Sequence, residues 1–188
     1  MMATPPQDNR RWSTIMVVLG LSMIWTFLSR VPADATTGGA LPASPREGFP
    51  APDFKLDVLG GRQVTLSQLR GQVVMINLWA SWCAPCRIEM PAIEKVYRAY
   101  RDQGFVVLGL NTTFQDSEIE AAAFVDQLGL TFPILLDRSG ATSNRYQLRA
   151  LPSTYFVDRK GIIRAAVFGA MNDALIESKV AELVKETP

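Results

Sequence analysis

The sequence contains no histidine and only two cysteines among its 188 residues. Without histidine, the chain lacks the commonest general base and the commonest metal ligand of proteins. Two cysteines alone cannot supply the four ligands of a usual structural zinc site within one chain. Arg87 follows the second cysteine, at the position where a c-type haem attachment site requires histidine. We therefore expect neither a metal ion nor another cofactor in this protein.

The sequence also has no large excess of positive or negative charge. The formal net charge is +1, and from residue 51 onward fifteen Lys and Arg residues balance fifteen Asp and Glu residues. A region without net charge does not attract the phosphate backbone of nucleic acids, so we expect no nucleic-acid partner. Apolar residues make up 48% of the chain, which is enough for the core of one ordinary domain with accessory segments.

An uncharged run near the N-terminus predicts export of the rest of the chain. The run WSTIMVVLGLSMIWTFL occupies residues 12–28 and follows two arginines at positions 10–11. Its length is at the lower limit for a membrane-spanning helix, and the arginines favour a cytoplasmic N-terminus. We predict a cytoplasmic segment at 1–11 and a transmembrane signal anchor at 12–29. The alternative is a signal peptide cleaved at the A-x-A motif of residues 33–35, which also exports the body.

The segment that follows the apolar run has the composition of a linker. Residues 30–50 contain four prolines, three glycines and few large apolar side chains. Such a segment cannot bury enough surface to offset the entropy of ordering. We predict a flexible linker at 30–50 and a globular domain at 51–188.

The periodicity of the remaining sequence predicts an α/β domain with a mixed sheet. Apolar runs bounded by glycines and turns predict seven strands, at 54–59, 62–66, 73–79, 105–110, 134–136, 154–157 and 162–168. Helical spacing predicts three helices, at 84–102, 117–128 and 173–185. Asp116 or Ser117 is expected to cap the second helix, and Asn172 or Asp173 the third.

Both cysteines lie in the stretch WASWCAPCR at 79–87, between a predicted buried strand and a predicted helix. Unpaired N–H groups and the helix dipole lower the pKa of a thiol at such a helix start. We expect Cys83 to face solvent as the nucleophile and Cys86, one turn later, to attack the mixed disulfide that Cys83 forms. Pro85 suits the first helical turn. A purely structural disulfide is the alternative, although so short a loop removes little chain entropy.

Three motifs together resemble the thioredoxin superfamily, and within it the TlpA/ResA-like branch of membrane-anchored thiol-disulfide oxidoreductases. They are INLWASWCAPCR at 76–87, EMP at 89–91 and LPSTYF at 151–156. The resemblance extends from about residue 50 to the end of the chain. It implies a thioredoxin-like fold, with a central mixed sheet flanked by helices, and a thiol-disulfide oxidoreductase activity.

The resemblance also implies roles for residues outside the cysteine pair. Pro152 is expected to be cis and to lie against the active-site disulfide, which leaves the backbone of Leu151 to pair with an extended substrate segment. Asn77 replaces the buried aspartate of thioredoxins. Glu89 matches the glutamate of the TlpA/ResA-like branch, and burial would raise its pKa toward neutrality for proton exchange. A surface carboxylate is the alternative interpretation of Glu89.

Trp82 is expected to shape the rim beside Cys83 and to contact substrate, whereas Trp79 is expected to pack in the core. Arg87 either adds positive charge near the thiolate or is simply solvated. These expectations complete the predicted site.

The predicted function is reduction of disulfides in exported proteins, at a membrane surface facing away from the cytoplasm. In the family that the chain resembles, substrates include the cysteine pair of apocytochrome c, and a membrane electron-donor protein resupplies the reductant. Two alternatives remain. A disulfide oxidase would use the same fold at a higher reduction potential. A membrane-tethered binding module would carry a passive disulfide. A peroxidase is disfavoured because no Ser or Thr precedes Cys83 by three residues.

Overall fold

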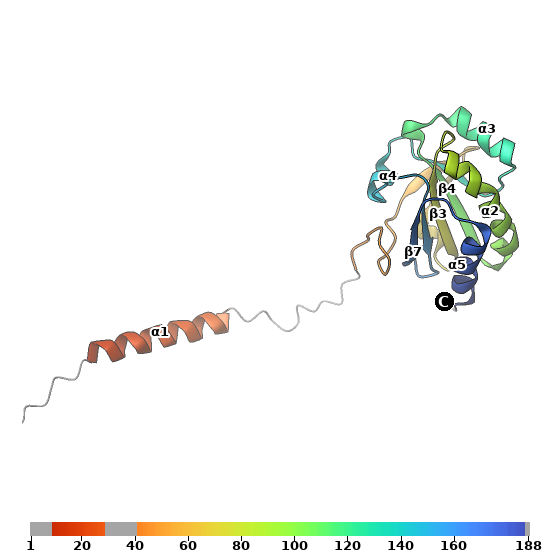
Figure 1. Cartoon of the computed structure of the whole chain (residues 1–188). Helices are drawn as coiled ribbons and strands as arrows, with labels where there is room; N and C mark the ends of the chain where they lie inside the picture. The colour runs from red at the N-terminus through yellow and green to blue at the C-terminus, as the bar shows by residue number, and fades with distance from the viewer. Residues whose placement is uncertain (1–8, 29–40, 187–188) are drawn as a thin grey trace, which may run out of the picture. The chain divides into compact units, whose positions relative to one another are not determined.

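The computed structural model describes residues 9–28 and 41–186, and the chain divides into the units Met1–Ala40 and Leu41–Pro188. The first unit holds helix α1 (Asn9–Leu28), drawn in red in Figure 1. Within the described residues, we find no helix with the length and apolar character needed to cross a membrane. The anchor predicted at 12–29 is therefore not confirmed. Residues 1–8 and 29–40, which include much of the predicted linker, lie outside the described residues.

The second unit is built on one seven-stranded sheet with the strand order β2-β1-β5-β4-β3-β6-β7. Strand β3 pairs in parallel with β4 and antiparallel with β6, so the sheet is mixed, as predicted. The strands are β1 (Lys55–Val58), β2 (Gln63–Thr65), β3 (Val73–Trp79), β4 (Phe105–Asn111), β5 (Ile134–Leu136), β6 (Ser153–Val157) and β7 (Ile163–Phe168). All seven predicted strands are confirmed to within one or two residues.

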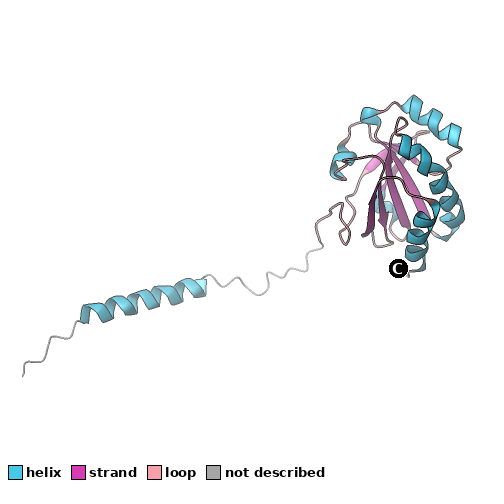
Figure 2. Ribbon diagram, viewed as in Figure 1, coloured by secondary structure: helices cyan, strands magenta, loops and turns pink. Residues whose placement is uncertain are grey.

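Helices flank this sheet, as Figure 2 shows in cyan around the magenta strands. Helices α2 and α5 contact each other and lie side by side in Figure 1. The α-helices of this unit are α2 (Ala84–Tyr100), α3 (Glu118–Leu128), α4 (Ala141–Arg145) and α5 (Asp173–Lys185), and short 3-10 turns occupy Leu66–Leu69, Arg101–Gln103 and Thr113–Gln115. The sequence analysis missed α4 because five residues are too few to show helical periodicity.

The helix caps resolve the alternatives that the sequence left open. The Ser117 side chain accepts a hydrogen bond from the backbone N–H of Ile119 at the start of α3. At the start of α5, the Asn172 side chain accepts a hydrogen bond from the backbone N–H of Leu175. Ser117 and Asn172 are therefore the caps, and Asp116 is free for a different role.

The core divides between the two faces of the sheet, and β3 contributes to both. Alternate residues of a strand point to opposite faces. Val73, Met75 and Trp79 join the apolar cluster that contains residues of α2 and α5. The even-numbered residues of this strand join the cluster on the other face. Asn77 lies two positions from both Met75 and Trp79, so its side chain points to the same face of the sheet, which α2 covers.

The globular unit begins ten residues earlier than the predicted boundary at 51. The backbone N–H of Gly48 donates to the carbonyl of Ile163, and the Glu47 carboxylate accepts from the N–H of Ala166. Residues 41–50, predicted as part of the linker, therefore attach to β7. Composition did not indicate this attachment because it depends on hydrogen bonds, which do not require large apolar side chains.

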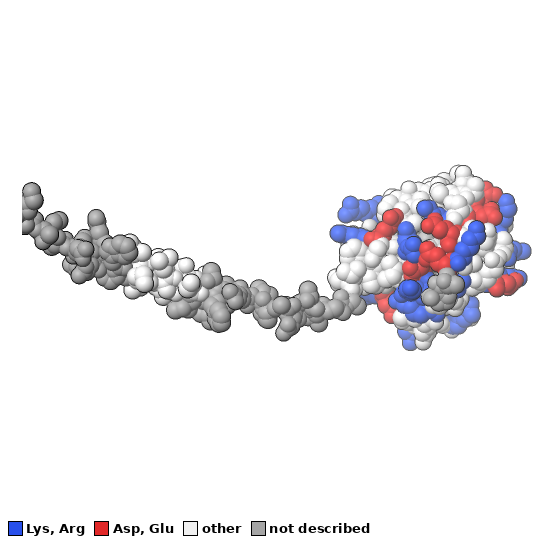
Figure 3. Space-filling model, turned by 90° about the horizontal axis from the view of Figure 1, so that it is seen from below, with Lys and Arg blue, Asp and Glu red and all other residues white. Residues whose placement is uncertain are grey.

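The surface carries charges of both signs. Figure 3 shows Lys and Arg interspersed with Asp and Glu on the face seen from below. Several charged side chains of the domain are paired, as Arg138 is with Glu118 and Asp57. This mixed surface agrees with the neutral composition of the domain.

Candidate active site

The two cysteines lie at the junction of β3 and α2, as predicted. Cys83 is the N-cap residue of α2, and its Sγ accepts a hydrogen bond of 3.2 Å from the backbone N–H of Cys86. Pro85 occupies the first turn, where its missing N–H is not needed. The cysteines form a disulfide with an S–S distance of 2.02 Å. The helix N-terminus therefore directs a backbone donor at the sulfur that is expected to carry negative charge.

The prediction that Cys83 faces solvent is wrong for this oxidised state. Cys83 is only 4% exposed, and Cys86 is completely buried. However, Cys83 lines a groove of about 500 Å³. The groove residues come from the cysteine turn, the loop after β4 and the segment from α4 to β6, and they are Trp82, Cys83, Ala84, Pro85, Phe114, Gln115, Ser143, Asn144, Leu148, Arg149, Ala150 and Leu151. Cys83 is thus covered by its neighbours but borders an open groove.

Trp82 stands at the rim of this groove with 60% of its surface exposed. Its Nε1 donates a hydrogen bond of 3.0 Å to the carbonyl oxygen of Gln115, which fixes the ring. Leu151 lines the same groove, and the Leu151–Pro152 peptide bond is cis, as the resemblance implied. The structure therefore brings Trp82 and Leu151 together beside Cys83, while their contact with substrate stays a prediction.

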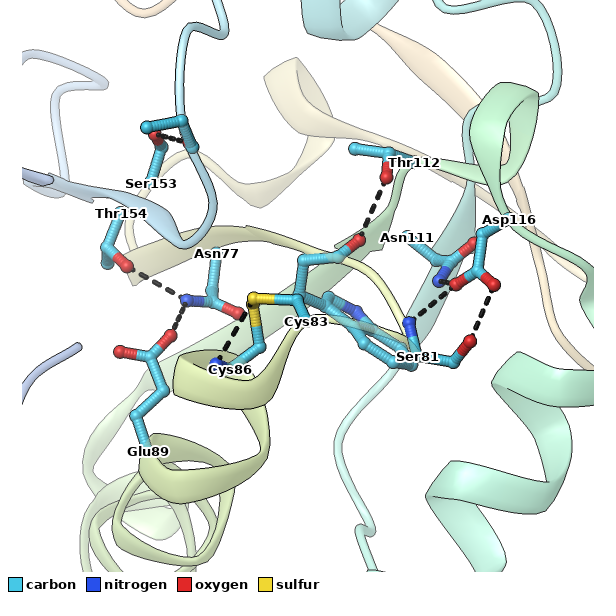
Figure 4. Close-up of a disulfide and its surroundings, with 12 residues drawn as sticks. Asn77, Ser81, Cys83, Cys86, Glu89, Asn111, Thr112, Asp116, Ser153 and Thr154 are labelled. Atoms are coloured by element: carbon cyan, nitrogen blue, oxygen red, sulfur yellow. Dashed lines mark hydrogen bonds between the residues drawn. A yellow bond between two sulfur atoms is a disulfide. The ribbon is translucent and has the colours of Figure 1, made fainter. Parts of the chain in front are cut away.

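Asp116 holds the turn that precedes the cysteines, a role that the sequence analysis missed. Its carboxylate accepts hydrogen bonds from the Ser81 N–H and hydroxyl, both at 2.6 Å, and from the Asn111 amide at 2.7 Å (Figure 4). Burial raises the pKa of Asp116, but hydrogen bonds from Ser81, Asn111 and Ser117 outweigh burial and lower it overall. The ionised carboxylate thus anchors the cysteine turn to the end of β4. Only the position of Asp116 after a strand could have suggested this role.

Glu89 is completely buried, so the alternative of a surface carboxylate is excluded. Its Oε1 accepts a hydrogen bond of 2.7 Å from Asn77 Nδ2, and its Oε2 accepts one of 3.1 Å from the Met171 N–H. Burial raises the pKa of Glu89 from its ordinary value of 4.5 to about 7, although the two hydrogen bonds partly offset this effect. Asn77 Nδ2 also donates to Thr154 Oγ1, so one amide links α2 to β6 (Figure 4).

Two further motif residues, Trp79 and Arg87, both contact the Phe124 ring of α3. Trp79 is fully buried and packs against Phe124 with 4.7 Å between ring centroids, as predicted for a core residue. The exposed Arg87 guanidinium lies 4.6 Å from the centroid of the same ring and donates to Gln127 on α3. Arg87 therefore connects α2 to α3. In residues 9–28 and 41–186, no three Cys, Asp or Glu side chains form a group that could hold a metal ion.

Comparison with known proteins identifies this arrangement. The family model described as the AhpC/TSA family matches residues 48–166. The thiol-disulfide oxidoreductase ResA of Halalkalibacterium halodurans is 33% identical over 172 residues, which cover 92% of each chain. A crystal structure described as a thiol:disulfide interchange protein DsbE of Chlorobium tepidum superimposes with a TM-score of 0.69 and 29% identity, over 74% of this chain and 98% of that one.

A second solved structure carries information on location. It is described as a secreted Mycobacterium tuberculosis disulfide oxidoreductase homologous to DsbE, with a TM-score of 0.64 and 25% identity, and the match covers 69% of this chain and 96% of that one. These likenesses confirm the thioredoxin-like fold. The chain therefore belongs to the AhpC/TSA family, and it is a thiol-disulfide oxidoreductase similar to ResA.

Proposed function

We propose that this protein reduces disulfides in exported proteins on the extracytoplasmic side of a membrane. Cys83 is the attacking nucleophile, Cys86 is the resolving thiol and Glu89 exchanges the proton of Cys86. The single observation that carries the proposal is the position of the Cys83 sulfur. It caps α2, accepts a hydrogen bond from the N–H of Cys86 and borders a groove of about 500 Å³.

The reaction follows from thiol–disulfide exchange. The Cys83 thiolate attacks one sulfur of the substrate disulfide, and the other substrate sulfur leaves as a thiolate. Cys86 then loses its proton and attacks the Cys83 sulfur, which releases the second substrate thiolate. Two electrons have moved to the substrate, and the Cys83–Cys86 disulfide of this structure is the product. A dithiol donor must reduce that disulfide before the next turnover.

Glu89 supports the second step. It lies three residues after Cys86 on the same face of α2, and both side chains are fully buried. A carboxylate with a pKa of about 7 can take up the thiol proton near neutral pH and return it in the reverse direction. An ordinary carboxylate with a pKa near 4.5 would be a weaker base.

The proposed location depends mainly on the N-terminal sequence. The apolar run at 12–28 and the arginines before it favour a membrane anchor with the domain exported. A similar protein is described as secreted. In this setting a membrane electron-donor protein would resupply Cys83 and Cys86, and the paired cysteines of apocytochrome c would be one fitting substrate.

Mixed-disulfide trapping tests the proposal with two matched variants. In Cys86→Ala the resolving thiol is absent, so Cys83 should hold exported proteins in stable mixed disulfides. In Cys83→Ala the remaining thiol is buried and should capture none. Mass spectrometry of the trapped proteins would identify the substrates. Equal capture by both variants, or none by either, would contradict the assigned roles and favour a binding module with a passive disulfide.

The direction of electron flow needs a separate measurement. Reduction potentials in this fold range from about −270 mV for a reductant to about −120 mV for an oxidant. Equilibration of the full chain with glutathione should give a value near the reducing end. A value near the oxidising end would instead assign the protein as a disulfide oxidase. Turnover of hydrogen peroxide in the same preparation would reveal a peroxidase.

A further inference from the structure

We propose that Asn77 accepts a hydrogen bond from the thiol of Cys86 when the disulfide is reduced, and that this bond favours the reduced state. The starting observation is an unpaired polar atom in the interior. Asn77 is completely buried, and within the described part of the chain its Oδ1 has no hydrogen-bond partner. Buried polar atoms are almost always paired, so an exception beside a reactive group calls for an explanation.

The orientation of the Asn77 amide is set by its other end. Nδ2 donates to Glu89 Oε1 at 2.7 Å and to Thr154 Oγ1 at 2.9 Å, so both of its N–H bonds are used. An ionised carboxylate can only accept hydrogen bonds. The nitrogen must therefore face Glu89 whenever that carboxylate is charged, which turns Oδ1 to the opposite side.

The opposite side is occupied by the cysteine pair. Asn77 lies two positions from both Met75 and Trp79 on β3, so its side chain points to the same face of the sheet as theirs. Met75, Trp79 and Cys86 belong to one apolar cluster on that face, beneath α2. In Figure 4, Asn77 lies between Glu89 and the disulfide, with its nitrogen toward Glu89 and its oxygen toward the sulfurs. Within the described residues, Glu89 is the only charged group that hydrogen-bonds to this amide.

Reduction supplies the missing donor. In the disulfide, the Cys86 sulfur carries no hydrogen and cannot donate to Asn77. A dithiol reductant delivers two electrons and two protons, the S–S bond breaks, and Cys86 gains an S–H group. A thiol is a weak donor, but in a buried site it would pair an acceptor that otherwise lacks a partner. Asn77 therefore penalises the oxidised form and stabilises the reduced one. This inference uses the redox pair of the proposed function but does not depend on the identity of the substrate.

Infrared spectroscopy can observe the proposed bond directly. The chain has only two cysteines, so Cys83→Ala leaves Cys86 as the single thiol and the S–H stretching band belongs to it alone. We expect this band at a lower frequency than that of a free thiol in an apolar solvent, because hydrogen bonding weakens the S–H bond. A band at the free-thiol frequency would overturn the proposal without any change at Asn77.

A second substitution assigns the acceptor. In Cys83→Ala/Asn77→Leu, which keeps the number and branching of the side-chain heavy atoms, the band should move to the free-thiol frequency. The matched control is Cys83→Ala/Thr112→Val, which removes a buried hydroxyl bonded to the Trp79 carbonyl and not to Asn77. The control should keep the lowered frequency. The same S–H frequency in the two double variants would show that a group other than Asn77 accepts the hydrogen bond from the thiol.

The redox equilibrium gives an independent measurement. With both cysteines present, Asn77→Leu should shift the equilibrium with glutathione about tenfold toward the disulfide, which corresponds to about 30 mV toward more negative potential. Thr112→Val should leave the equilibrium within about twofold of the parent. A shift in the opposite direction, or equal shifts in both variants, would contradict the role of Asn77. Loss of exported-protein capture by Cys86→Ala would count against the proposed function and would leave this result unaffected.

Discussion

Glu89→Gln removes a carboxylate that has no contact with solvent and keeps the size of the side chain. The size of the expected effect follows from the pKa of Glu89. Burial raises the Glu89 pKa from 4.5 to about 7, and one pKa unit corresponds to about 1.4 kcal/mol. Ionising this group in the folded protein therefore costs about 3 kcal/mol more than in the unfolded chain.

The sign of the pH dependence follows from proton binding. Between pH values of about 4.5 and 7, the folded protein holds a proton on Glu89 that the unfolded chain has released. The free energy of unfolding must therefore fall as pH rises through this window and level off above it. Glutamine does not ionise, so the variant should lack this fall. It also has one oxygen instead of two, so one of the hydrogen bonds from Asn77 and Met171 is lost at every pH.

Urea denaturation of the oxidised protein at a series of pH values measures both effects. The free energy of unfolding of the parent minus that of Glu89→Gln should decrease by about 3 kcal/mol between pH 4.5 and pH values above 7. The hydrogen bond that the variant loses shifts this difference by the same amount at every pH, so it does not affect the decrease. The pH profile of disulfide exchange should lose its inflection near 7 in the same variant. Parallel stability curves across this window would refute the assignment of a raised pKa.

Glu94→Gln is the matched control on the same helix. Burial raises the pKa of Glu94, but hydrogen bonds from Thr131 and Arg98 outweigh burial and lower it overall. A lowered pKa contributes stability that is present above the unfolded pKa and lost as pH falls through the folded value. The difference curve for Glu94→Gln should therefore change at acidic pH and in the opposite direction.

Three other substitutions test the fold and the groove. Ser117→Ala should lower the free energy of unfolding by about 1 kcal/mol in urea, because the N–H of Ile119 loses its cap. Gly109→Ala should cost about 1–3 kcal/mol in the same assay, because the new Cβ would lie 2.8 Å from the Phe132 ring. Trp82→Ala should lower kcat/KM for insulin reduction and leave reduction of a small disulfide unchanged, because this exposed ring borders the groove. Equal losses for both substrates would argue against a substrate contact.

Local sequence signals were sufficient for the elements that position the cysteines. The apolar run 73–79 forms a fully buried strand because its residues suit both faces of a central strand. Cys83 and Pro85 begin the helix because the N-terminal turn tolerates residues that a helix interior does not. Each of these signals lies within a few residues of the element that it specifies.

Contacts between distant segments were not predictable in the same way. The groove beside Cys83 is also lined by Phe114 and Leu151, which lie far from Cys83 in the sequence. The anchoring of Ser81 by Asp116 joins residues 35 positions apart. Nothing in the residue types alone distinguishes Asp116 from an ordinary helix cap, so only the fold could reveal its partner.

The register of the central strands connects the fold to the chemistry. Asn77 on β3 lies opposite Thr154 on β6, and their side chains share the face beneath α2. The same register places the segment with the cis Leu151–Pro152 bond directly before the start of β6, beside the cysteine turn. A slip of one residue would turn Asn77 to the other face and leave Glu89 without its amide partner. The apolar residues that alternate along β3 resist such a slip, because it would also move Met75 and Trp79 out of the core cluster under α2. The packing of the sheet thereby fixes the surroundings of the buried carboxylate, and substitutions that weaken that packing should change the pH dependence of disulfide exchange before they unfold the domain.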